Sequence, residues 1–192
     1  MIPTSFSTDS VHVQIWRVIE LLDDLPAAPA SGHRLDELAS SFKALRAQAT
    51  EKRTAAEEQI WSAWCDHPEA RAKAAIANGI QQLSASDLER AEVIFDDLVA
   101  EYPFWAEARN KRATLYFLQN RDAMSVIDIH RTLELEPRHF GALAGFAQIC
   151  VRNGAPDAAR RALLRLLAIN PGAPGIAEAA AALADDASHV LH

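Results

Sequence analysis

Two groups of residues carry side chains suited to metal binding or nucleophilic catalysis. His130 and His139 lie nine positions apart with Glu136 between them, and one aspartate separates Cys65 from His67. Imidazole and carboxylate groups are ligands for zinc, and a thiol next to an imidazole can act as a nucleophile. Each group therefore has to be compared with the geometry that its chemistry requires.

Neither spacing meets that requirement. Side chains on one face of a helix are three or four residues apart, and Pro137 ends any helix that contains His130. The segment from Cys65 to His67 lacks a third group to orient the histidine, and the sequence has no glycine-rich phosphate loop. Ser125 falls where the periodicity described below requires a small buried residue. We predict no catalytic residue, no metal site and no cofactor, and hence a protein that is not an enzyme.

Composition and charge exclude further classes of function. The 192 residues are 49% apolar, carry a formal charge of −7 and have a pI near 5.5. Nucleic-acid binding needs a basic surface that neutralises phosphates, so we expect no nucleic-acid partner, whereas a basic partner is compatible with this charge. The two cysteines, Cys65 and Cys150, lie in separate halves of the chain without CxxC spacing, which predicts neither a disulfide nor a structural zinc site.

Membrane association is also not expected. Residues 1–9 have no positively charged start followed by an uninterrupted apolar run, and no segment approaches the roughly 20 apolar residues of a membrane span. The polar side of the first predicted helix carries Glu20, Asp23 and Asp24 and only one arginine. Anionic lipid would repel this negatively charged face. We predict a cytoplasmic chain, the alternative being a longer precursor that carries an export signal.

Hydrophobic periodicity divides the first part of the chain into two helical regions. Residues 1–34 contain a helix at about 10–25 and a linker rich in proline at 25–33. The β-branched residues of the first segment would also allow a strand, but its length and its polar stripe favour a helix. Residues 35–68 have apolar side chains every three or four positions on both sides of a polar turn at 48–53, which predicts a helical hairpin.

Internal periodicity organises the rest of the sequence. Pro103, Pro137 and Pro171 are 34 residues apart, and Pro68 precedes the first of them by 35. Small residues recur at this interval in two columns and large apolar residues in a third. The three columns are Gly79, Ala113 and Ala147; Ala91, Ser125 and Ala159; and Phe95, Ile129 and Leu163.

A pair of antiparallel helices explains these columns. Where two helices cross closely, only small side chains fit, and bulky residues fill the space on either side. A proline ends the second helix of each pair because it cannot donate to the helix ladder. The spacing predicts three hairpins at about 72–103, 106–137 and 140–171, within a repeat region at 69–171.

These features resemble the tetratricopeptide repeat, a helical hairpin of 34 residues. The segments 106–114 (AEARNKRAT) and 135–143 (LEPRHFGAL) are also similar to blocks of short bacterial tetratricopeptide proteins, in which a tryptophan-containing helix like 60–64 (IWSAW) precedes the repeats. The resemblance implies an all-α superhelix in which a helix within 172–192 covers the last hairpin and the N-terminal helices close the opposite end. It implies a scaffold and not an activity.

The join between the second and third repeats has a structural interpretation. We expect Glu136, Arg138 and His139 to order this join, with Phe140 driven into the core. Gly141 would then allow a close approach of another element. The histidine therefore has a structural role in this interpretation, not a metal-binding one.

The resemblance places the binding surface on the concave side, which the first helix of each hairpin lines. By position, the residues that would contact a partner are Lys73, Ile76, Ile80, Asn110, Thr114, Phe117, Gln148 and Arg152. Asn110 would hydrogen-bond the backbone of an extended peptide, with Phe117 beside it. Ile76 and Ile80 stand where chaperone adaptors of this family need polar groups to hold a carboxylate, so we do not predict chaperone binding.

Two functions are consistent with this scaffold. We predict a non-catalytic adaptor that binds a peptide or protein partner on the concave face. The alternative is a structural subunit that docks through its terminal helices in a larger or homo-oligomeric complex, since Trp16, Trp61 and Trp64 are of a residue type favoured at interfaces.

A basic edge on the last hairpin has two interpretations as well. Arg160, Arg161 and Arg165 lie together on its second predicted helix. They form either a solvated face balanced by nearby acids or a site for an acidic or phosphorylated partner. Of these we favour the solvated face.

Overall fold

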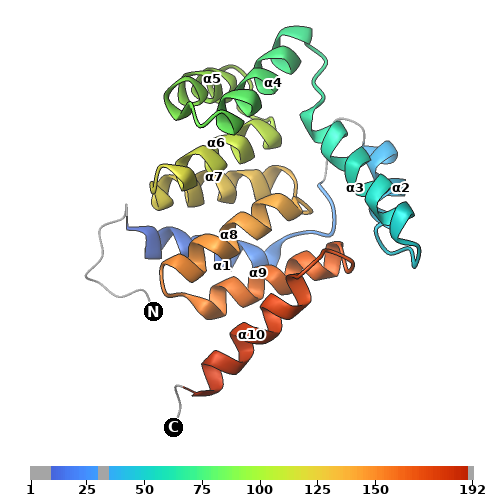
Figure 1. Cartoon of the computed structure of the whole chain (residues 1–192), viewed down its shortest axis with the longest axis vertical. Coiled ribbons are helices and arrows are strands. Elements are labelled where there is room, and N and C mark those ends of the chain that lie inside the picture. Colours follow the sequence, from blue (N-terminus) through green and yellow to red (C-terminus); the bar gives the residue numbers. More distant parts are fainter. Residues whose placement is uncertain (1–9, 30–34, 190–192) are drawn as a thin grey trace.

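The computed structural model describes residues 10–29 and 35–189, which form ten α-helices and no strand (Figure 1). The helices are α1 (Val11–Asp24), α2 (Leu35–Ala44), α3 (Thr50–Cys65), α4 (Ala70–Ser84), α5 (Leu88–Glu101), α6 (Ala106–Leu118), α7 (Asp122–Leu135), α8 (Phe140–Arg152), α9 (Pro156–Ile169) and α10 (Ile176–His189). Helices α4 to α9 pack as three consecutive pairs. The predicted all-α repeat fold is confirmed. Among the described residues, no helix is long and apolar enough to cross a membrane.

Each of the three hairpins turns at a residue with a left-handed backbone. Ser86, Asn120 and Gly154 have φ values of 60°, 59° and 70°, and they are 34 residues apart. In each turn, the amide of the following residue donates to the carbonyl five positions earlier, at 2.8–2.9 Å. This Schellman closure satisfies carbonyls at the end of the first helix and directs the chain back along it.

Close helix crossings account for the columns of small residues. A Cβ atom on Gly79 would lie 2.6 Å from the ring of Phe95, so the first hairpin needs glycine there. In the second hairpin, Ser125 is 1% exposed and its Oγ donates to the backbone oxygen of Ala113 at 2.7 Å. In these two hairpins the small residues thus lie where the helices cross.

The buried apolar side chains form two separate clusters. The smaller cluster, which we call the first core, joins α4 and α5 and reaches one side of α6. The larger cluster, the main core, extends from α6–α9 to α1, α2, α3 and α10. Helix α10 packs against α9 and buries Ala180, as a helix that caps the last hairpin should.

Helix α1 does not close the open side of the first hairpin, and that expectation is wrong. It packs against α7 and α9, with Val18 completely buried in the main core. Arg161 of α9 forms an ion pair with Asp23, and Arg165 donates to the backbone oxygen of Leu25 at 3.1 Å. The apolar stripe of α1 thus covers the second helices of two hairpins, and part of the basic edge is engaged within the chain.

Helices α2 and α3 pair with each other as predicted, but they lie beside the stack rather than on its end (Figure 1). Helix α3 contacts α6 as well as α4. Ile60 and Trp64 are buried in the main core and not in the first core. The hairpin therefore belongs structurally with the second and third repeats.

Candidate functional site

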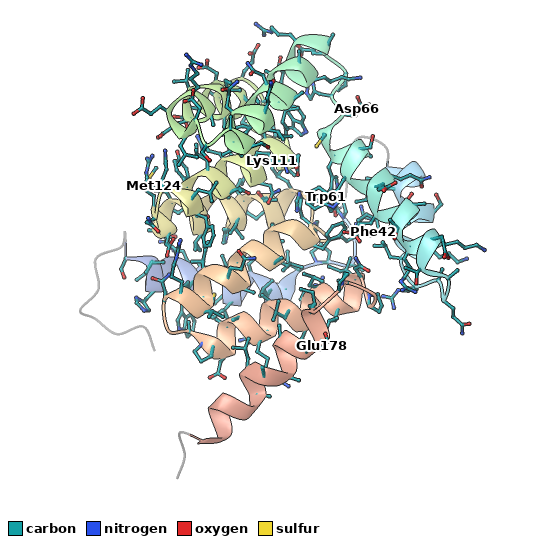
Figure 2. All side chains as sticks on the ribbon, viewed as in Figure 1. Phe42, Trp61, Asp66, Lys111, Met124 and Glu178 are labelled. Atoms are coloured by element: carbon teal, nitrogen blue, oxygen red, sulfur yellow. The ribbon has the colours of Figure 1, made fainter. Side chains whose placement is uncertain are left out.

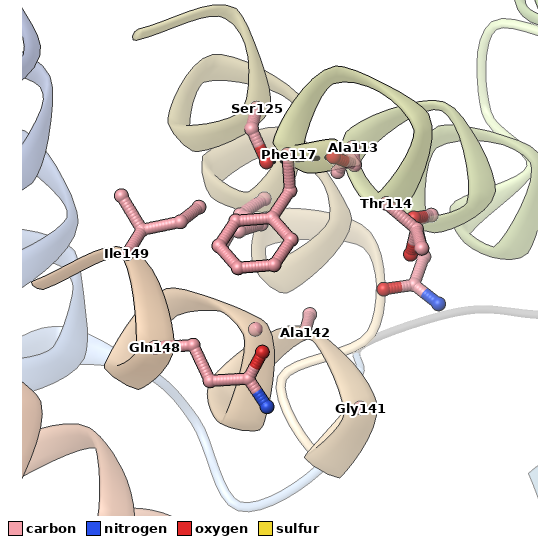
Figure 3. A pocket seen from close by; sticks show the side chains of 11 residues that line it. Ala113, Thr114, Phe117, Ser125, Gly141, Ala142, Gln148 and Ile149 are labelled. Atoms are coloured by element: carbon pink, nitrogen blue, oxygen red, sulfur yellow. Dashed lines mark hydrogen bonds between the residues drawn. The ribbon is translucent and has the colours of Figure 1, made fainter. Parts of the chain in front are cut away.

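A narrow groove lies between α6 and α8, the first helices of the second and third hairpins (Figure 3). It encloses a cavity of about 70 Å³. The lining residues are Asn110, Ala113, Thr114 and Phe117 of α6, Ser125 and Ile129 of α7, and Gly141, Ala142, Gly145, Gln148 and Ile149 of α8. Four of the eight residues predicted to contact a partner line this groove.

The polar residues of the groove differ in how far they are already engaged. Asn110 is 6% exposed and its Nδ2 donates to Glu107 at 3.3 Å, while the Thr114 hydroxyl donates to the backbone oxygen of Asn110 at 3.0 Å. Gln148 is exposed, and within the described part of the chain its amide has no hydrogen-bond partner. The whole amide of Gln148 is therefore able to hydrogen-bond a ligand.

Arg152 does not line the groove but packs on Phe117, which does. Its guanidinium lies 3.9 Å from the centre of the Phe117 ring and donates to the Phe117 backbone oxygen at 3.2 Å. Its Nε donates to Asp122 at 2.9 Å. The charge of Arg152 is thus neutralised within the protein.

The three predicted residues of α4 lie elsewhere. Ile76 is 2% exposed in the first core, and Ile80 packs half-buried against the same core, so both side chains contribute to that core and neither lines the groove. Lys73 is exposed and its Nζ is 2.7 Å from Asp66. The apolar side of α4 faces α5 and α6, which explains why position in the repeat did not place these residues in the groove.

Beside the groove lies a buried polar network that the sequence did not reveal. Glu107 is completely buried, and its carboxylate is 2.8 Å from His139 Nε2 and 2.8 Å from Lys111 Nζ. The Nδ1 atom of His139 accepts the amide of Ala142 at 3.1 Å and caps α8, so Nε2 carries the hydrogen that bonds Glu107. Cys65 Sγ lies 3.8 Å from the same carboxylate. The network joins α3, α6 and α8.

Burial and charge act in opposite directions on Glu107. Burial alone raises the pKa of this carboxyl, but the hydrogen bond from His139, together with the charge and hydrogen bond of Lys111, outweighs burial and lowers the pKa below its ordinary value. The pKa of the Cys65 thiol is raised to about 11 by burial, with Glu107 adding to the effect. A thiol so rarely ionised is a poor nucleophile.

Two tryptophans fix α3 onto this network. The Trp64 ring stacks on His139 with ring centres 4.1 Å apart, and the Trp61 ring meets Phe140 edge-on at 5.2 Å. A Cβ on Gly141 would lie 2.5 Å from Trp61, so this glycine permits the approach. The predicted roles of Phe140 and Gly141 in the join are confirmed.

Glu136 and Arg138 complete the join between the second and third repeats. Two nitrogens of the Arg138 guanidinium donate to the two oxygens of Glu136 at 2.8 and 2.9 Å. The same guanidinium lies 4.0 Å from the centre of the Phe42 ring of α2. In the described residues, no group of three or more His, Cys, Asp and Glu side chains is placed to hold a metal ion.

A stack of antiparallel helix pairs with a groove between its first helices defines a helical-repeat protein. No family model matches the sequence. The chain is 30% identical over 151 residues to a TPR repeat-containing protein of Rhizobium etli, a match that covers 79% of this chain and 73% of that protein. The chain therefore belongs to the TPR repeat-containing proteins, whose repeats serve in general as protein–protein interaction modules.

Proposed function

We propose that the protein is a non-catalytic adaptor that binds an extended peptide segment of a partner protein in the groove between α6 and α8. The partner would contact Asn110, Thr114, Phe117 and Gln148, which line the groove, and Arg152, which packs on Phe117. Lys73, Ile76 and Ile80 are not part of this proposal, because they lie on α4 outside the groove lining.

The observation that best supports this proposal is the glycine at position 145, which lines the groove. A glycine inside a helix costs about 1 kcal/mol relative to alanine, so it usually answers a need of the fold. Gly141, one turn earlier, has such a need because of Trp61, but a Cβ on Gly145 would meet only Ile129 Cδ1 at 3.9 Å. No contact of the fold requires Gly145. Its effect is to keep the groove open for a group from outside.

The chemistry of the lining defines the kind of segment that would fit. The lining residues carry no charged side chain, and Asp122 neutralises Arg152, which packs on the lining residue Phe117. A cavity of about 70 Å³ accommodates a small apolar side chain. The amide of Gln148 can donate to and accept from a peptide backbone. We infer an extended segment that presents an uncharged residue with a small side chain.

Selection of peptides from a random library on the full chain would test this proposal. Selected peptides should bind Gly145→Leu, which fills the cavity, at least about tenfold more weakly than the wild type. Gln148→Ala should weaken binding by a smaller factor through the lost backbone hydrogen bonds. Val151→Ala is the matched control, because Val151 is 54% exposed on the same helix and does not line the groove. Peptides that bind all four proteins equally would refute the groove as the site.

The second candidate function is docking through the terminal helices. Of the three tryptophans that suggested it, the structure leaves Trp16 exposed and uses the other two within the chain. Trp64 is 7% exposed and Trp61 packs against Phe140, so both tryptophans are used within the chain. Trp16 of α1 is 43% exposed and could contact another subunit. A concentration-dependent mass in light scattering that Trp16→Ser abolishes would support this candidate, and a constant monomeric mass would oppose it.

A further inference from the structure

An exposed aromatic hollow lies away from the groove, between the α3–α4 link and the α5–α6 link. Its volume is about 410 Å³, and it shares no lining residue with the groove. Phe104 is 74% exposed, more than any other large apolar side chain among the described residues. The wall also includes His67, Tyr102 and Trp105, together with two prolines and the carboxylates of Asp66 and Glu101. Figure 2 shows Asp66 at the end of α3, where the chain leads to α4.

The rings of this wall pack against one another, and the Tyr102 hydroxyl and the Trp105 indole N–H already donate within the protein. The His67 ring lies 4.5 Å from Tyr102 and 4.8 Å from Trp105, centre to centre. The Tyr102 hydroxyl donates to Glu69 at 2.8 Å, and the Trp105 Nε1 donates to the backbone oxygen of Trp64 at 2.8 Å. Aromatic grooves that bind proline-rich segments use such donors for the peptide carbonyls, so this wall suits that ligand poorly. It offers mainly ring faces and carboxylate acceptors, which suit a donor.

The charge of the lining favours a cationic donor. Asp66 and Glu101 line the hollow, whereas no lysine or arginine does. Their ion-pair partners, Lys73 and Arg71, approach from α4, and Arg71 and Glu101 are both well exposed. Exposed ion pairs are weak and exchange readily, so an incoming cation can share these carboxylates. The formal charge of −7 on the whole chain would attract such a partner.

The protein already contains the arrangement that the hollow offers. Arg138 lies over the Phe42 ring at 4.0 Å while two of its nitrogens bond the carboxylate of Glu136. Arg131 of α7 lies 5.7 Å from the centre of the Phe104 ring, which shows that a guanidinium can approach this side chain. A planar guanidinium stacks on aromatic faces and binds carboxylates through paired N–H groups, which an ammonium group does not do.

We propose that this hollow is a second binding site, which takes the guanidinium of an arginine side chain in a basic segment of a partner protein. The ring faces of Phe104 and Tyr102 stack on the guanidinium, and Glu101 accepts its N–H groups. The site is independent of the groove between α6 and α8, so either can fail without the other.

A titration of the 192-residue chain with model peptides tests the site. The probe is a capped glycine peptide with two arginines, and its control carries citrulline, the uncharged isostere of arginine, at both positions. Two-dimensional ¹⁵N NMR follows the four tryptophan indoles, with Trp105 assigned from Trp105→Phe. The arginine peptide should shift the Trp105 indole and the Phe104 amide saturably, and the citrulline peptide should not. Phe104→Ser and Glu101→Gln should each weaken binding by about fivefold.

Matched controls decide between specific and diffuse binding. Glu178→Gln removes an exposed carboxylate on α10, far along the chain from the hollow, and should leave the affinity unchanged. Equal shifts with citrulline, an equal loss in Glu178→Gln, or no saturable shift at millimolar peptide would each overturn the proposal. A lysine peptide that binds as tightly as the arginine peptide would overturn the assignment to guanidinium. Groove variants such as Gly145→Leu should bind this probe normally.

Discussion

Glu107 brings a carboxylate into the interior, where an unpaired charge is strongly unfavourable. Its oxygens instead contact His139 and Lys111, both at 2.8 Å, and Asn110 at 3.3 Å. His139 is the N-cap of α8, the other two come from α6, and Cys65 of α3 lies 3.8 Å away. The Glu107 side chain therefore contacts both the groove residue Asn110 and Cys65 of α3, and so fixes the position of α3 relative to the groove.

Removing the charge of Glu107 should be costly. Glu107→Gln leaves Lys111 without its anion and weakens the hydrogen bond from His139, and we expect the free energy of unfolding at pH 7 to fall by about 3 kcal/mol. In the wild type, the folded-state pKa of Glu107 lies below its ordinary value of 4.5. Its contribution is therefore complete above the unfolded-state pKa and disappears as the pH falls through the folded-state pKa. Urea unfolding at pH 7 and at several acidic pH values measures both effects.

An exposed glutamate provides the control for this measurement. Glu58→Gln on α3 removes one carboxylate from the surface and should change stability by no more than about 0.5 kcal/mol. The acid loss of stability should be shallower in Glu107→Gln than in the wild type and in Glu58→Gln. Parallel pH profiles for all three proteins would contradict the assigned role of the buried carboxylate.

At the scale of elements, two glycines of α8 have different roles. Gly141 permits the close packing of Trp61, whereas Gly145 has no such close neighbour and lines the groove. Gly141→Ala would place a Cβ 2.5 Å from Trp61 and should lower stability by about 1–3 kcal/mol, because α3 must shift. Gly145→Ala meets its nearest neighbour at 3.9 Å and should raise stability by up to about 1 kcal/mol through helix propensity. Urea denaturation compares the two. An equal loss in both variants would mean that Trp61 does not constrain α8.

The hairpins themselves were predictable because each repeats the same local contacts. The prolines at 34-residue intervals mark the ends of α5, α7 and α9, and the small columns mark their crossings. The turn residues Asn120 and Gly154 also follow from sequence, since asparagine and glycine tolerate a left-handed backbone. Such signals arise from residues close together in the chain, and periodicity detects them.

The positions of α1 and α3 could not be predicted in this way. Asp23 meets Arg161 across 138 residues, and neither α1 nor α3 repeats a pattern that names its partner. Their amphipathic sequences predict a buried face but not the surface that buries it. The same limit applies to Ile76, because its place in the repeat does not show which of its neighbours covers it. The network around Glu107 was missed because its residues come from three helices.

At the scale of the molecule, the two cores are unequal. The first core is built from α4, α5 and one side of α6. The main core is built from α8 and from residues of the helices around it, which are α1, α2, α3, α6, α7, α9 and α10. Polar contacts cross the boundary: Arg112 donates to Asp96 of α5 at 2.9 Å and to Asp128 of α7 at 2.7 Å. In repeat proteins each hairpin is stabilised mainly by its neighbours, and the first hairpin has a substantial neighbour on one side only. It should open before the rest.

Native-state hydrogen exchange followed by mass spectrometry tests this inequality. Amides of α4 and α5 should exchange through openings of lower free energy than amides of α8 and α9. Phe95→Ala and Phe146→Ala form a matched pair, because both rings are completely buried but lie in the first and the main core. Each should cost about 3–5 kcal/mol locally. Phe95→Ala should accelerate exchange in α4 and α5 and leave α8 and α9 protected, whereas Phe146→Ala should reduce protection throughout. Uniform acceleration by Phe95→Ala would show instead that the two cores unfold as one unit, and that the polar contacts of Arg112 couple them fully.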